Sequence, residues 1–141
     1  MKLTARKVLV LALVLIFVGY IGAALVQTDF GNVEITELKY VGEMGLAQSA
    51  VIYKPDTASA DNPAPCIILE HGWYNNKEMQ DMNCVEYARR GYVVVALDQY
   101  SHGDSDRIGI GYEYAGGNGM NECVKMVADI PYVDNTRIGI S

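Results

Sequence analysis

The chain has 141 residues, enough for one domain, and its 17 acidic against 11 basic residues give a formal net charge of −6. This balance excludes a nucleic-acid-binding protein, because phosphate contacts need a clustered basic face and the sequence has none. Hydrophobic residues make up 50% of the chain, which excludes a disordered tail. They form only one long apolar run, which excludes a multi-helix membrane protein.

Residues 8–26 (VLVLALVLIFVGYIGAALV) are that uncharged apolar run. As a helix it would be about 28 Å long, close to the thickness of the hydrocarbon layer of a bilayer. Lys2, Arg6 and Lys7 precede it, so the positive-inside rule places the N-terminus in the cytoplasm and the following chain outside the cell membrane. We predict a single-pass anchor over residues 1–26. The alternative is a cleaved signal peptide and a secreted domain, although such a peptide usually has a shorter apolar core.

A spacer over residues 27–32 leads to a domain predicted over residues 33–141. Val33–Val41 partly alternates apolar and polar side chains, as a half-buried strand does. Residues 48–54 (QSAVIYK) follow a glycine-containing turn and predict a second strand, so the two would form an antiparallel hairpin. Residues 55–65 are rich in Pro, Asp, Ser and Asn, which indicates an exposed loop.

Short apolar runs then alternate with helical periodicity. Residues 66–69 (CIIL) and 92–97 (YVVVAL) predict strands of the kind that is buried in a parallel sheet, and residues 137–141 (RIGIS) begin a third apolar strand. A helix between the last two, ended by Pro131, is predicted from the spacing of Met120, Cys123, Val124 and Val127. Strands and helices in alternation with short connections are typical of an α/β fold with a mostly parallel sheet.

An earlier helix is predicted between the first two apolar strands. Asn75 would cap it, since Glu78 follows at capping-box spacing, and Gly91 would end it in the position after the last turn. The residues expected on its buried face, three positions apart, are Met79, Met82, Val85 and Ala88.

The three cysteines, Cys66, Cys84 and Cys123, form no CxxC pair, and only His71 and His102 could join them in a metal site. Three is an odd number for a disulfide framework, so we predict small buried hydrophobic residues. The spacing of these residues gives little support to a zinc site. We therefore expect neither a metal nor another cofactor.

The chain stops within the last strand–helix–strand unit. A parallel strand at that point is normally followed by a helix that covers it, and three parallel strands with an appended hairpin leave one sheet edge open. We therefore expect the chain to be the N-terminal fragment of a longer protein, or a truncated reading of a longer gene.

Two loops leave the carboxyl ends of the predicted parallel strands, where ligands bind on open parallel sheets. They cover residues 70–75 (EHGWYN) and 98–105 (DQYSHGDS). Gly72, directly after a strand, lets the backbone bend sharply and point N–H groups into a cleft. Such groups form oxyanion holes, although His71 and Gly72 would equally suit an ordinary strand-to-helix turn.

Three segments, LEHGWYNNKE, ARRGYVVVALDQYSHGDSD and YVDNTRIGIS, resemble in order and spacing the first half of the α/β-hydrolase fold. The closest likeness is to the dienelactone hydrolase, acetyl-esterase and prolyl-oligopeptidase branch, and it covers residues 33–141. The resemblance implies an antiparallel hairpin leading into a mostly parallel sheet with flanking helices. In this family an HG turn after the third strand supplies the oxyanion hole, and a V-D-x-x-R-I-G-I segment leads into the nucleophile elbow G-x-S-x-G.

By this resemblance, the backbone N–H of Trp73 is a donor of the oxyanion hole, because Trp73 directly follows the HG pair. Tyr74 is a second candidate for a backbone donor. His71 and Gly72 would shape the turn. The indole of Trp73 can cover the end of the sheet at the same time, since the donor belongs to the backbone.

The resemblance also implies that the whole catalytic triad lies outside these 141 residues. The nucleophile would follow a few residues after Ser141, which belongs to the segment leading into the elbow. Ser101 and Ser105 lie in a different loop, and His71 and His102 precede the elbow, whereas the catalytic histidine of the family comes near the end of the chain. The chain alone is therefore expected to be inactive.

Several other polar residues have structural interpretations. Asp98, Asp104 and Asp106 lack the spacing of an EF-hand loop, so we predict turn formation rather than calcium binding. Asp134 and Arg137 resemble a structural pair that precedes the elbow strand in the family.

Three loop tyrosines, Tyr100, Tyr112 and Tyr114, are candidates to line a substrate cleft, with exposed loop aromatics as the alternative. The glycine-rich stretches at residues 109–111 and 116–119 complete neither a G-x-G-x-x-G nor a Walker A motif, so nucleotide binding is not expected.

The functional hypothesis is therefore the N-terminal part of a membrane-anchored serine hydrolase. The parent protein would cleave a small-molecule ester, or less readily a peptide, through an acyl-enzyme. Its partners would be that substrate and the membrane crossed by residues 8–26, with no nucleic acid. The alternative is a non-catalytic, membrane-tethered interaction module derived from the same fold.

Overall fold

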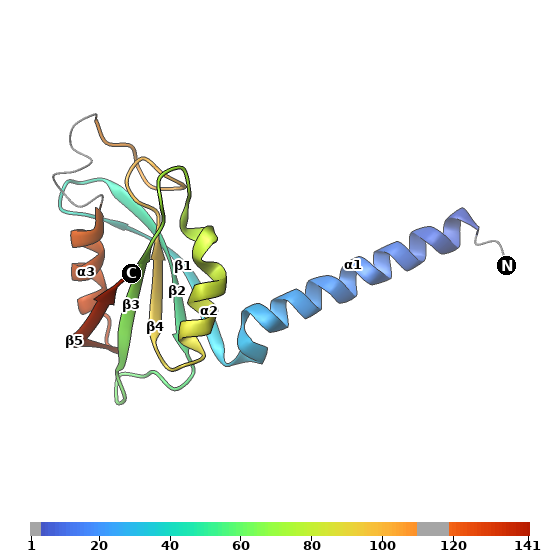
Figure 1. The fold of residues 1–141 in the computed structure, drawn as a ribbon, viewed down its shortest axis with the longest axis horizontal. Helices are drawn as coiled ribbons and strands as arrows, with labels where there is room; N and C mark the ends of the chain where they lie inside the picture. The colour runs from blue at the N-terminus through green and yellow to red at the C-terminus, as the bar shows by residue number, and fades with distance from the viewer. Residues whose placement is uncertain (1–3, 110–118) are drawn as a thin grey trace.

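The computed structural model describes residues 4–109 and 119–141. Its first element, α1 (Ala5–Gln27), projects from an α/β domain and has no buried residue (Figure 1). Within the described part of the chain, α1 is the helix that is long and apolar enough to cross a membrane, and a signal sequence near the N-terminus would meet the same criterion. A single turn of 3-10 helix, η1 (Asp29–Gly31), connects α1 to the domain.

The domain is built on a five-stranded mixed sheet in the order β1-β2-β4-β3-β5. β1 (Val33–Val41) and β2 (Ala47–Pro55) form the antiparallel hairpin that the sequence predicts, and β2 also pairs antiparallel with β4 (Val93–Leu97). β3 (Ala64–Glu70) lies between β4 and β5 (Val133–Ile140) and is parallel to both. The predicted α/β class, with a hairpin leading into parallel strands, is thus confirmed.

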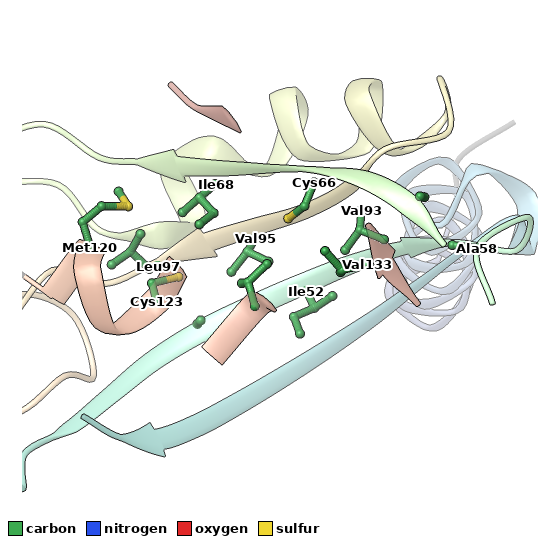
Figure 2. Close-up of a cluster of buried hydrophobic side chains, with 13 residues drawn as sticks. Ile52, Ala58, Cys66, Ile68, Val93, Val95, Leu97, Met120, Cys123 and Val133 are labelled. Carbon is green, nitrogen blue, oxygen red and sulfur yellow. The ribbon is translucent and has the colours of Figure 1, made fainter. Parts of the chain in front are cut away.

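Helices cover both faces of this sheet. α3 (Met120–Ala128) lies on one face, whereas η2 (Lys77–Gln80) and α2 (Asp81–Ala88) lie on the other (Figure 1). Successive residues of a strand point to opposite faces, so β4 contributes to both cores. Figure 2 shows the core on the α3 side, to which β4 contributes Val93, Val95 and Leu97. The other two residues of β4, Val94 and Ala96, pack on the α2 side.

The first helix of the domain begins later than the sequence predicts. Asn75 does not cap it: η2 begins at Lys77 and α2 begins at Asp81, and neither has a side-chain hydrogen bond from its N-cap residue. Instead, the backbone N–H of Asn75 donates to the carbonyl of Gly72 at 3.1 Å, closing a turn. The predicted capping box is therefore wrong.

The buried face of this helix agrees with the prediction only in part. Val85 and Ala88 pack against the sheet as predicted, together with Cys84, but Met79 and Met82 are 65% and 87% exposed. A 3-10 turn has three residues per turn rather than 3.6, so the residues that follow η2 lie elsewhere around the helix axis than a single α-helix would place them. Two exposed methionines are the result.

The second helix and the cysteines agree with the predictions. Met120, Cys123 and Val127 of α3 face the core, and all three cysteines are buried and unpaired. Burial raises the pKa of each thiol to about 12. These groups are therefore neutral, apolar parts of the two cores near neutral pH.

Candidate active site

The loops that follow β3 and β4 lie at the same end of the sheet (Figure 1). They enclose a cleft of about 610 Å³ lined by residues 73–76, 79 and 99–103. This is the carboxyl end of two parallel strands, where ligands bind on open α/β sheets. The two loops singled out in the sequence therefore contribute to one cleft.

The first wall of the cleft is a β-turn. Its hydrogen bond joins Gly72 and Asn75, and Tyr74 has a left-handed backbone with φ 71°. A positive φ at the third residue but not at the second, Trp73, is typical of a type II turn. The hydrogen bond that closes a β-turn involves neither of the two middle N–H groups. The N–H groups of Trp73 and Tyr74 donate to no other residue within the described part of the chain. Two free amides thus lie side by side at the cleft.

His71 lies beneath this turn and is only 3% exposed. Its Nε2 accepts a hydrogen bond from the backbone N–H of Gln99 at 3.1 Å, and the Gln99 side-chain amide donates back to the His71 carbonyl at 2.7 Å. Since Nε2 is an acceptor, a neutral ring carries its proton on Nδ1, which lies 2.9 Å from the Gly72 carbonyl. The imidazole is thus engaged on both nitrogens and joins the two loops.

A buried ion pair forms a second connection between the loops. The Lys77 ammonium lies 2.8 Å from the Asp98 carboxylate, and the two side chains are 3% and 0% exposed. Asp98 also accepts the backbone N–H groups of Lys77 at 2.8 Å and Asp104 at 2.9 Å. The Asp104 carboxylate lies 3.0 Å from the same ammonium at the surface. Burial lowers the pKa of Lys77, but these acceptors outweigh it and the pKa is raised overall.

Sequence reasoning missed Lys77. It assigned Asp98 and Asp104 to turn formation, and the structure shows that both also bind a lysine from the other loop. A signal was present: Asp98 directly follows a wholly apolar strand, and a charge at such a position needs a partner because an unpaired buried charge is costly.

The cluster of Lys77, Asp98 and Asp104 requires a glycine at position 103. Gly103 has a left-handed backbone with φ 48°, and a Cβ at this position would lie 2.2 Å from the Asp98 carboxylate. No side chain fits without displacing the carboxylate. The glycine therefore lets the loop after β4 wrap tightly around Asp98.

The far end of this loop is fixed to β2. Asp106 accepts the backbone N–H of Ala47 at 2.8 Å and donates its own N–H to the Ala47 carbonyl at the same distance. The Ser105 hydroxyl donates to the Asp98 carbonyl at 2.8 Å and accepts the Ser49 N–H at 2.9 Å. Ser105 and Asp106 thus hold the loop in place and do not face the cleft.

Neither a protein-family model nor a curated protein matches the sequence. Solved structures, however, resemble the fold. Acetyl xylan esterase 1 from Thermoanaerobacterium sp. JW/SL YS485 matches with a TM-score of 0.64 and 22% identity, over 77% of this chain and 40% of that one. The α/β hydrolase GrgF from Penicillium sp. sh18 matches with a TM-score of 0.62 and 16% identity, over 76% of this chain and 36% of that one. The esterase Pf2001 from Pyrococcus furiosus matches with a TM-score of 0.62 and 17% identity, over 80% of this chain and 43% of that one. The chain has the α/β-hydrolase fold.

At these identities the likeness establishes the fold alone, and the chain spans 36–43% of the length of the three structures. In the α/β-hydrolase fold, one amide of the oxyanion hole belongs to the loop between β3 and the next helix, and the other follows the nucleophile. The turn that contains Trp73 and Tyr74 lies in that first loop.

Neither Ser101 nor Ser141 forms the serine–histidine pair of an α/β hydrolase. Ser101 lines the cleft with a left-handed backbone of φ 70°, and its hydroxyl accepts the Ile108 N–H at 3.1 Å. Ser141 extends the pairing of β5 with β3 through its backbone. Within residues 4–109 and 119–141, no serine hydroxyl is hydrogen-bonded to a histidine ring.

His102 completes the floor of the cleft. Its ring lies 5.0 Å from the ring of His71 and 6.0 Å from the indole of Trp73, measured between centroids. Its Nδ1 lies 3.1 Å from the Tyr100 carbonyl. Tyr100 is buried and lines the cleft, whereas Tyr112, Tyr114 and the glycine-rich segment around them lie outside the described residues.

Asp134 and Arg137 form the contact that the sequence suggests, at the start of β5. The guanidinium lies 2.6 Å from the carboxylate, which also accepts the Thr136 backbone N–H at 3.0 Å. Hydrogen bonds from Thr136, and next from Arg137, lower the pKa of Asp134 to about 2. The pair lies away from the cleft, within β5, where the pairing of β5 with β3 is irregular.

Proposed function

We propose that this chain is the N-terminal part of a membrane-anchored serine hydrolase that cleaves ester bonds. The observation that carries the proposal is the pair of free amides at Trp73 and Tyr74, held in a β-turn at the cleft of an α/β-hydrolase fold. Esters are the favoured substrate class because two of the similar structures are described as esterases.

The chemical role of the turn follows from charge development during acyl transfer. When a nucleophile attacks an ester carbonyl, the carbonyl oxygen becomes an oxyanion, and fixed N–H donors stabilise it without reorganisation. The Trp73 amide would be one donor, with Tyr74 as a nearby second candidate. His71 and Lys77 would act indirectly. They hold the loop that carries the turn, after β3, against the loop that follows β4.

The remaining catalytic groups would come from a longer chain. In α/β hydrolases the triad follows in the order Ser, Asp or Glu, His, beginning at the elbow after the fifth strand. This chain covers only 36–43% of the length of the three similar structures, which supports the proposal that further catalytic groups belong to a longer chain. We propose that the 141 residues alone do not hydrolyse esters.

We further propose that α1 anchors the protein in the cell membrane, with the N-terminus in the cytoplasm and the domain outside. The support is its length of 23 residues, its lack of buried residues and the basic Arg6 and Lys7 in its first turn. Secretion after cleavage is the alternative, and N-terminal sequencing of the mature protein separates the two.

A fluorophosphonate probe, which labels activated serines, tests the function. The gene is read past the codon for Ser141, and both the resulting protein and the 141-residue chain are expressed in membranes and treated with the probe. The longer protein should be labelled at a G-x-S-x-G serine, and the 141-residue chain should not. A stop codon directly after Ser141 would refute the proposal and favour a tethered interaction module.

A further inference from the structure

A continuous row of exposed apolar side chains crosses the α2 face of the domain. This apolar ridge comprises Val26, Met82, Met79, Tyr74 and Trp73, which are 64%, 87%, 65%, 90% and 56% exposed. Single exposed apolar residues are ordinary, but a contiguous set indicates a contact surface.

The ridge is continuous from the end of α1 to the cleft. Val26 and Met82 line a common hollow between α1 and α2. Met79 lies one turn before Met82, and it lines the cleft together with Trp73 and Tyr74. The two aromatic rings are in edge contact, with centroids 6.2 Å apart.

The position of α1 decides what the ridge faces. α1 leaves the domain on the side of α2, opposite α3 (Figure 1). Its last turn adjoins α2, and the Arg89 guanidinium lies 3.0 Å from the carboxylate of Asp29, just beyond the helix. A bilayer crossed by α1 would therefore lie on the same side as the ridge.

We infer that the apolar ridge rests on the outer surface of the bilayer that α1 crosses, an inference that depends on the membrane anchor proposed above. The composition fits this partner. Trp and Tyr prefer the membrane–water interface, where the ring is apolar and its polar tip is hydrated. Methionine is flexible and apolar and adapts to a disordered acyl layer. Because a helical anchor already holds the domain at the membrane, a small apolar surface suffices to orient it.

This orientation has a direct effect on the cleft. Trp73, Tyr74 and Met79 belong both to the ridge and to the lining of the cleft. A domain seated on the ridge therefore opens its cleft at the lipid–water boundary. A domain tethered only through α1 would turn freely and present the cleft to bulk water.

The test places an environment-sensitive fluorophore at single cysteines of the full chain in phosphatidylcholine vesicles. Met82→Cys reports on the ridge, and Met79→Cys repeats the measurement at an independent ridge position. Leu15→Cys in the middle of α1 reports on the anchor. Asn121→Cys, exposed on α3, is the matched control on the opposite face. The native thiols do not interfere, because all three are buried.

Quenching by doxyl-labelled lipid and by aqueous iodide is then compared. The inference expects lipid quenching and a blue shift at Met82→Cys and Met79→Cys, and iodide quenching alone at Asn121→Cys. If the Leu15→Cys label is quenched by lipid but both ridge labels respond only to iodide, the ridge inference fails and the anchor stands. Ridge labels protected from both quenchers would mean that protein covers the ridge, which also refutes the inference. If Leu15→Cys shows no lipid quenching, the anchor itself is refuted.

Discussion

The Lys77 ammonium and the Asp98 carboxylate lie 2.8 Å apart in a site where at most 3% of either side chain is exposed. Lys77 follows β3 and Asp98 follows β4, so this pair joins the two loops that form the cleft. The carboxylate also accepts two backbone N–H groups, one from each loop. Its removal from water is therefore compensated by three donors, the ammonium and these two amides, rather than by the lysine side chain alone.

Lys77→Met should be strongly destabilising. The variant keeps most of the apolar stem but leaves the Asp98 charge buried without its cation, which typically costs about 3–5 kcal/mol. Asp104→Asn is the matched control: it removes an exposed partner of the same ammonium and should leave the free energy of unfolding nearly unchanged. Urea unfolding of the full chain in detergent micelles measures both. Equal, small losses would show that the ion pair is not important for stability.

Gly103→Ala and Gly45→Ala separate crowding from backbone strain. Both glycines have a positive φ, but only the Cβ at Gly103 would meet the Asp98 carboxylate, whereas the Cβ at Gly45 would meet open space. We expect Gly45→Ala to lower the free energy of unfolding by about 1–2 kcal/mol. Gly103→Ala should lower it by about a further 1–3 kcal/mol. Similar losses in the two variants would contradict the tight wrapping around Asp98.

Trp73→Pro and Trp73→Phe test the proposed oxyanion donor in the longer protein that is proposed above to be a hydrolase. Proline suits the second position of a type II turn but has no N–H, so it removes the donor while preserving the turn. Trp73→Pro should lower kcat by about 10²–10³-fold with little change in KM. Trp73→Phe keeps the amide and should retain most of the activity. Equal kcat values in the two variants would exclude the Trp73 amide from the oxyanion hole.

The lowered pKa of Asp134 predicts how the stability of the fold changes at acid pH. The folded-state pKa of about 2 lies below the ordinary value of 3.8, so the contribution of Asp134 to stability is present above pH 3.8 and is lost as the pH falls through about 2. Carboxyl-carbon NMR measures this pKa directly. Thr136→Val removes the hydroxyl and should raise the pKa of Asp134 toward 3.8. A pKa near 3.8 in the unsubstituted chain would contradict the hydrogen bonds described for this part of β5.

Local patterns predicted most of the fold. β4 is a run of apolar residues because both of its faces are buried, and that pattern is visible in five consecutive letters of the sequence. The hairpin of β1 and β2 is equally local. The start of the first domain helix was predicted wrongly because its cap comes from a distant residue. Asp98 accepts the backbone N–H of Lys77, the first residue of η2, and takes the role that the sequence assigned to Asn75.

The candidate site was predicted only in part for the same reason. The loop of Trp73 and Tyr74 is visible as a glycine after a strand, since the bend is a local requirement. The contacts His71–Gln99 and Lys77–Asp98 join residues 28 and 21 positions apart. Their partners are set by the pairing of β3 with β4, and no periodicity in either loop encodes that pairing.

The two hydrogen bonds that Gln99 donates to His71 make the base of the two cleft loops a single cooperative unit. Gln99 donates both bonds, one from its backbone N–H to the His71 ring and one from its side-chain amide to the His71 carbonyl. Displacing either loop therefore breaks both bonds at once, and the two loops should open together rather than in turn. We therefore expect the cleft to open in one step, with the turn that bears Trp73 moving only when both hydrogen bonds break.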